Sequence, residues 1–189
     1  MIRYTLLILC FAPLSLLAQQ KLERESRIKP NDVPEVALGF LENGQVTAKT
    51  KWYFEENLEG NSIEAKFRQD GHRYSVEFDT LGLIQDIEIE VKELALETAV
   101  LSAMTDHLGS TFTNYRIRKI QVQYSGAPEV LNKILASYPE VGVVVTRYEI
   151  VVKGRNAEET ALYEFTFDEA GGFIKQQQII FKNANHLEY

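Results

Sequence analysis

The chain has 189 residues, of which 45% are hydrophobic, and its formal net charge is −7 at pH 7. This length can bury a core as one domain or as two small ones. The acidic balance argues against nucleic acid or an anionic membrane surface as partner, because phosphate binding needs clustered Lys and Arg. The single cysteine, Cys10, lies near the N-terminus, so the remaining chain has no thiol for disulfides or thiolate catalysis.

The N-terminus predicts a secretory signal peptide over residues 1–18. A basic residue, Arg3, precedes an apolar run from Thr5 to Leu17, and Ala18 is followed by polar residues. The run is shorter than the roughly 20 residues that a spanning helix needs. We therefore expect cleavage after Ala18, a periplasmic or secreted location, and no membrane span in the mature chain. Cleavage removes Arg3 and changes the formal net charge from −7 to −8.

Residues 19–31 are polar and charged and predict a linker. Residues 32–94 predict a first unit, in which one helix precedes four antiparallel strands. The helix is expected to begin at Asn31 or Asp32, which are good N-cap residues, and to end near Gly44.

The first strand of this unit is expected over 46–54. Trp52 lies on the apolar side of the alternation and is predicted to be in the core, whereas Lys51 and Tyr53 lie on the opposite side. Tyrosine is enriched at interfaces, so Lys51 and Tyr53 are candidates for a protein-binding surface. A solvated sheet face is the alternative explanation.

Residues 95–182 predict a second unit of helix, strand, helix and three strands, followed by a tail at 183–189. Its second helix, over 127–138, is an extra element that the first unit lacks. The second unit is therefore expected to resemble the first without being a clean copy of it.

The strand predicted over 115–124 is rich in Arg and Lys. Its apolar positions change parity between residues 117 and 120, which a β-bulge or an edge position would explain. Tyr115, Arg116 and Arg118 form a second candidate for a protein-binding surface, again with a solvated sheet face as the alternative.

One stretch occurs twice, as an alternating strand that ends in Phe-Asp-x-x-Gly. The two copies contain Asp79 with Gly82, and Asp168 with Gly171. Asp can accept hydrogen bonds from the backbone ahead of it, and Gly tolerates the positive φ of a turn. The acids could also suggest a carboxylate pair, but a repeated turn explains them better. We interpret all four as structural turn residues.

The sequence predicts no catalytic residue, no cofactor and no metal site. His72, His107 and His186 lack the spacing of a metal-binding pair, and no nucleophile elbow or Gly-rich phosphate loop is present. Glu88 and Glu90 alternate with apolar residues and are interpreted as a solvated stripe on one strand.

These features resemble the secreted PepSY-like proteins of bacteria, whose fold is similar to that of beta-lactamase inhibitory protein. The signal peptide, Trp52 and the two Phe-Asp-x-x-Gly stretches carry the resemblance, which covers most of residues 32–182. It implies an α+β fold of two tandem units, each a helix packed on antiparallel sheet. The insertion at 125–140 departs from this pattern.

The resemblance also implies a non-enzymatic binding role outside the cytoplasm, such as a protein-binding or inhibitory domain, with an extracytoplasmic protein as partner. The alternative is a periplasmic protein that responds to a small molecule or ion through a pocket between helix and sheet. Fold does not fix function, so both hypotheses remain open.

Overall fold

The computed structural model describes residues 19–57, 60–138, 142–157 and 159–181. The predicted signal peptide and the tail at 183–189 lie outside these residues. The strands are β1 (Gln19–Ile28), β2 (Lys51–Asn57), β3 (Gly60–Gln69), β4 (His72–Asp79), β5 (Ile84–Val91), β6 (Asn114–Ser125), β7 (Val145–Arg155), β8 (Thr160–Asp168) and β9 (Phe173–Phe181). The α-helices are α1 (Glu35–Asn43), α2 (Thr98–Thr111) and α3 (Pro128–Leu135). Within the described residues, no helix combines the length and apolar character required to cross a bilayer.

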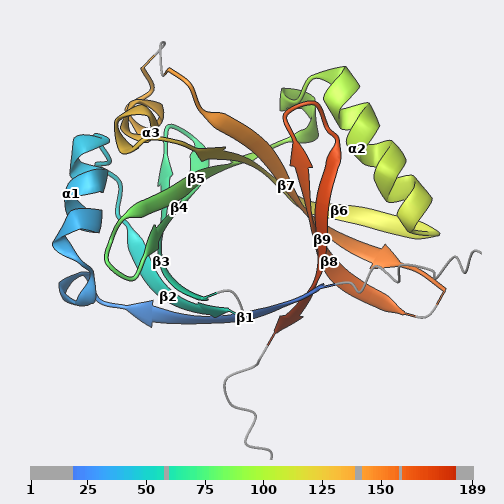
Figure 1. Cartoon of the computed structure of the whole chain (residues 1–189), viewed down its shortest axis with the longest axis horizontal. Coiled ribbons are helices and arrows are strands. Elements are labelled where there is room, and N and C mark those ends of the chain that lie inside the picture. Colours follow the sequence, from blue (N-terminus) through green and yellow to red (C-terminus); the bar gives the residue numbers. More distant parts are fainter. Residues whose placement is uncertain (1–18, 58–59, 139–141, 158, 182–189) are drawn as a thin grey trace, which may run out of the picture.

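All of these strands belong to one sheet that closes on itself. They follow each other in chain order, each antiparallel to the next, and β9 pairs in parallel with β1 to complete the ring. Figure 1 shows the ring end-on, with α1 and α3 outside one half and α2 outside the other. The sheet therefore has an outer face that meets helices and an inner face that encloses the centre.

The segment predicted as a linker is largely the strand β1, so that prediction was wrong. Its backbone pairs with β2 from Arg24 to Ile28 and with β9 from Gln19 to Glu23. The side chains of Arg24 to Arg27 are exposed, which explains the polar sequence. Backbone pairing, rather than an apolar face, holds this strand in the sheet.

The first helix begins later than predicted. A short 3₁₀ turn occupies Pro30–Asp32, and α1 starts at Glu35 after the N-cap residue Pro34. The residue before a proline is pushed towards extended backbone, and Val33 has φ −92° and ψ 136°, so the helix cannot run through it. Its C-cap is Gly44, as predicted.

Two apolar clusters lie on the outer face. The first packs α1 against strands β2 to β5 and includes Trp52, which is only 4% exposed, as its position in the alternation predicts. The second packs α2 against β6 to β8 around Phe165 and Phe167, both fully buried. Helix α3 contributes Leu131 and Leu135 to the first cluster and contacts α1, although the chain reaches it only after β6.

Both Phe-Asp-x-x-Gly stretches form the same turn. Asp79 Oδ1 accepts the backbone N–H groups of Leu81 and Leu83, at 2.9 and 2.8 Å. In the second copy, Asp168 Oδ1 accepts the corresponding N–H groups of Ala170 and Gly172, at 2.9 and 2.7 Å.

The glycine of each turn has a positive φ, +88° at Gly82 and +84° at Gly171, and lies against a helix. A Cβ atom at Gly82 would lie 2.8 Å from Pro34 Cβ, and one at Gly171 would lie 2.8 Å from the backbone oxygen of Val100. Each turn thus brings a helix start and a strand pair together.

Candidate functional site

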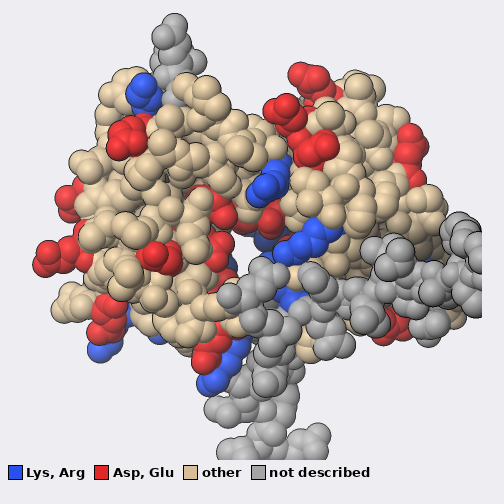
Figure 2. Space-filling view, viewed as in Figure 1, with Lys and Arg blue, Asp and Glu red and all other residues tan. Residues whose placement is uncertain are grey.

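The inner face of the sheet is polar because the strands alternate. On β4, Val76 and Phe78 point outward to the first apolar cluster, so Arg73, Ser75 and Glu77 point inward. The same alternation on the other strands places charged and amide side chains around the centre. In the space-filling view, acidic and basic side chains border an opening at the middle of the molecule (Figure 2).

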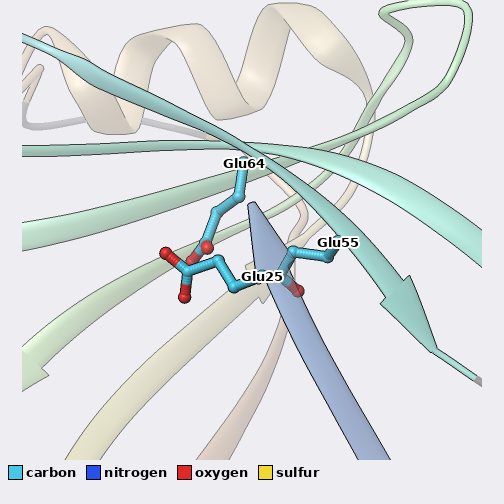
Figure 3. Close-up of side chains that lie close together, drawn as sticks. All are labelled: Glu25, Glu55 and Glu64. Carbon is cyan, nitrogen blue, oxygen red and sulfur yellow. The ribbon is translucent and has the colours of Figure 1, made fainter. Parts of the chain in front are cut away.

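Three inward carboxylates from neighbouring strands meet at one point. Glu25, Glu55 and Glu64 come from β1, β2 and β3, and an oxygen from each lies within 4.8 Å of the others (Figure 3). Carboxylate oxygens grouped in this way could ligate a divalent cation.

The ammonium group of Lys66 already occupies this point. Its Nζ lies 2.6 Å from Glu64 Oε2, 3.1 Å from Glu25 Oε2 and 3.9 Å from Glu55 Oε1. Burial lowers the pKa of Lys66, but the Glu64 and Glu25 carboxylates outweigh it and raise the pKa overall. The three carboxylates are therefore better described as a lysine-centred ion-pair cluster than as a metal centre.

One member of this cluster is shifted towards its protonated form at neutral pH. Burial raises the pKa of Glu55 to about 8, and the neighbouring carboxylate of Glu64 acts in the same direction, while Lys66 opposes them. The cluster can therefore pack three carboxyl groups around one ammonium because one of them stays neutral.

A second group of inward carboxyl groups lies on β5 and β7. Burial, followed by the charges of Glu77 and Glu149, raises the pKa of Asp86 to about 8. Burial also raises the pKa of Glu88 and that of Glu149. Gln123 donates from Nε2 to Glu149 Oε1 at 3.0 Å and to Asp86 Oδ2 at 3.4 Å. The interpretation of Glu88 as part of a solvated stripe was therefore wrong, because its side chain lies on the inner face of the closed sheet.

A cavity of about 480 Å³ opens at one end of the inner face. Its lining includes six cationic side chains and two carboxylates, from strands β2 to β6 and the loop before β2: Lys49, Lys51, Glu64, Lys66, Arg68, Arg73, Glu90 and Lys119. The buried side chains of Ser75 and Gln121 also line it. Charge on the inner face is thus divided, with carboxyl groups towards the middle and cations at this end.

The two surface patches predicted from the sequence lie on different parts of the sheet. Lys51 and Tyr53 are on the inward side of β2, and Lys51 lines the cavity. The Lys66 ammonium lies 5.1 Å from the centroid of the Tyr53 ring. Strands β3 to β5 separate this pair from the second patch on β6.

The second patch is itself divided. Arg118 is the extra residue of the predicted bulge, because Ile117 pairs with Val152 and Lys119 with Val151. Arg116 and Arg118 are exposed. Tyr115 instead packs against the second apolar cluster, and its hydroxyl lies 3.3 Å from the Thr105 carbonyl oxygen on α2.

The sequence reasoning missed the inner-face residues Glu55, Glu64, Lys66 and Arg68. Alternation marks them as polar positions, but an open sheet and a closed ring give the same alternation. No signal within a single strand distinguishes the two, because the ring closes through the pairing of β1 with β9.

Comparison with solved structures shows that the fold of this chain is similar to those of two bacterial proteins. A BLIP-like protein from Bacteroides fragilis NCTC 9343 matches with a TM-score of 0.50 and 20% sequence identity, over 82% of this chain and 92% of that chain. A DUF2874 family protein from Bacteroides ovatus ATCC 8483 matches with a TM-score of 0.51 and 15% identity, over 77% of this chain and 87% of that chain. No protein-family model and no curated protein sequence matches the chain. The BLIP-like, α+β part of the predicted fold is thereby confirmed.

Proposed function

We propose that this chain is a non-enzymatic binding protein that takes a small ligand at the inner face of its closed sheet. The observation that carries this proposal is the polar cavity of about 480 Å³ at one end of that face. Cavities of some 300–1,000 Å³ are typical of small-molecule sites. The likeness to a BLIP-like protein supports a binding role and names no reaction.

The predicted pocket between helix and sheet is a weaker candidate. Both helix–sheet seams are filled by buried apolar side chains, such as Phe78 beneath α1 and Phe165 beneath α2. A polar ligand there would displace packed core. The proposed function therefore keeps the alternative predicted from the sequence, a protein that responds to a small molecule or ion. It differs in the position of the ligand, which is the inner face of the sheet rather than a pocket between helix and sheet.

Ring closure also changes what a protein partner could reach. The inner face is enclosed by its own strands, so a folded partner would meet the rim of the ring rather than an open sheet. Arg116 and Arg118 are exposed and remain available for such a contact. A protein-binding or inhibitory role through these residues stays a prediction.

The proposal includes a periplasmic or secreted location and membership of the PepSY-like proteins. Its support is the sequence alone, in which Arg3 precedes the apolar run from Thr5 to Leu17 and Ala18 is followed by polar residues. The test is export of the full chain in a Gram-negative host, where a processed form in the periplasmic fraction is expected and an uncut cytoplasmic form would contradict it.

Single-cysteine labelling tests the binding role, because the chain beyond Cys10 contains no cysteine. Lys51→Cys places a thiol at the cavity, and Lys133→Cys places one on the exposed side of α3 as a control. The protein is screened by melting temperature against amino acids, sugars, carboxylates, nucleotides, polyamines and divalent metals. We expect at least one compound that raises the melting temperature and slows maleimide labelling at position 51 only. Stabilisation without this protection, or no stabilisation at all, would contradict the proposal.

A further inference from the structure

The cations of the 480 Å³ cavity exceed the carboxylates available to neutralise them. Both lining carboxylates are already paired, Glu64 with Lys66 at 2.6 Å and Glu90 with Arg73 at 3.2 Å. Four cationic side chains remain that form no ion pair within 4.0 Å among the described residues: Lys49, Lys51, Arg68 and Lys119. Lys119 also interacts electrostatically with Glu88 and Glu149.

This local excess of positive charge contrasts with the negative net charge of the whole protein. The chain is acidic overall, at −7, yet unpaired cations from the start of β2, the end of β3 and the middle of β6 converge on one hollow. Like charges held near one another repel, although all four of these side chains are exposed and solvent screens part of the repulsion. A bound anion would remove that cost.

The surroundings extend the basic character. An adjoining cavity of about 540 Å³ shares Arg68, Arg73 and Glu90 with the first and adds His72 and Lys92. Most of these cations come from different strands, while Lys49 and Lys92 lie just before β2 and just after β5. Their positions are therefore set mainly by the sheet rather than by one loop. The spread of cations suits a ligand with more than one anionic group.

We infer that the basic cavity binds a small multivalent oxyanion, a molecule that carries at least two carboxylate or phosphate groups. This inference rests on the proposed function and specifies the chemistry of its ligand. Lys49, Lys51 and Lys119 supply ammonium donors, and Arg68 supplies a planar guanidinium that can donate two hydrogen bonds to one anionic group. The volume excludes a folded partner and suits a molecule of metabolite size.

Calorimetric titration with citrate and with pyrophosphate tests this inference at about 20 mM and about 200 mM NaCl. Citrate represents carboxylates and pyrophosphate represents phosphates, so the two arms identify the anionic group. We expect one of them to bind, with affinity at least about tenfold weaker at the higher salt, because salt screens these charges.

Substitutions locate the binding. Lys51→Ala and Lys119→Ala are each expected to raise the Kd about tenfold, the effect of losing one charged hydrogen bond. Lys133→Ala on α3 is the matched control and should leave the Kd unchanged. Melting temperatures of all three variants establish that they are folded. Binding of either anion with the same Kd in all variants would overturn the inference.

The inference and the proposed function can fail separately. If neither anion binds, but a polyamine such as spermidine slows labelling of the thiol in the Lys51→Cys variant, the inner face is a ligand site and the anion assignment is wrong. If neither anion binds and no compound in the panel slows labelling of that thiol, both are wrong.

Discussion

The outer and inner faces of the sheet place different side chains on the same strands. On β8, Tyr163, Phe165 and Phe167 point outward into the second apolar cluster, while Glu164 points inward and pairs with Lys21 at 2.8 Å. The outer face gains stability by excluding water beneath helices. The inner face carries ionisable side chains, which form ion pairs, remain as neutral carboxyl groups or are available to bind a ligand. Stability and binding are thereby assigned to opposite sides of one layer.

Because the apolar core lies on the outer face, we expect truncation of a core side chain there to have the largest effect on the free energy of unfolding. Phe165→Ala removes a fully buried ring and should lower the free energy of unfolding by about 3–5 kcal/mol. Chemical denaturation measures this change. Leu81→Ala, at a side chain that is 71% exposed, should cost less than about 0.5 kcal/mol. Equal losses in the two variants would contradict the placement of the core.

The second-largest loss of stability is expected at the two Phe-Asp-x-x-Gly turns, where a glycine lies against a helix. Gly171→Ala adds a Cβ atom 2.8 Å from a backbone oxygen at a positive φ, and should cost about 2–3 kcal/mol. Gly71→Ala is the matched control, since its φ is +81° but no atom lies within 4 Å of the added Cβ. It should cost only about 1 kcal/mol. Similar losses would show that helix contact contributes nothing at Gly171.

The inner face predicts a stability that falls with rising pH. The pKa of Glu55 is raised to about 8 in the folded protein, from 4.5 without the fold, so only the unfolded chain releases this proton between these values. Its contribution is complete below about pH 4.5 and is lost as pH rises towards 8. Asp86, with a pKa raised to about 8, acts in the same direction.

Glu55→Gln isolates this contribution. Between pH 5 and pH 8 the variant should lose about 1–2 kcal/mol less unfolding free energy than the parent, measured by urea denaturation at each pH. Glu129→Gln, at an exposed residue on α3, should keep the parental slope. A parental slope in Glu55→Gln would show that this carboxyl group is ionised in the folded protein.

The smallest effect is expected at an exposed side chain of β6. Arg118 is exposed at the bulge of β6, so Arg118→Ala should change the free energy of unfolding by less than about 0.5 kcal/mol. A loss above about 1 kcal/mol would mean that the residue supports the sheet. It could then no longer serve as a probe of partner binding that leaves the fold intact.

Much of the outer face could be predicted from the sequence. Alternation placed Trp52 in the core. The parity change around residues 117–120 indicated a bulge or an edge position, and the structure shows a bulge, at Arg118. Both signals are local, because each depends on neighbouring residues of one strand. The start of α1 was misplaced because two prolines compete with the capping residues Asn31 and Asp32.

The candidate site was not predictable in the same way. Glu25, Glu64 and Lys66 meet because β1 pairs with β2 and β2 with β3, and no spacing within one strand records that meeting. Cations at the cavity likewise come from strands β2, β3, β4 and β6. The sequence marks such residues as polar, and only strand order brings them together.

By itself the sequence determined strands β2 to β9, the two Phe-Asp-x-x-Gly turns and the apolar face of the sheet, because these follow from side-chain periodicity and from the backbone preferences of Asp and Gly. Tertiary structure decided that the sheet closes. Closure depends on β1 pairing with β9, from Gln19 with Gln177 to Glu23 with Phe181, at the two ends of the described chain. Backbone hydrogen bonds make that contact, and they are available to almost any sequence, so residue types alone could not reveal that the polar face encloses a cavity.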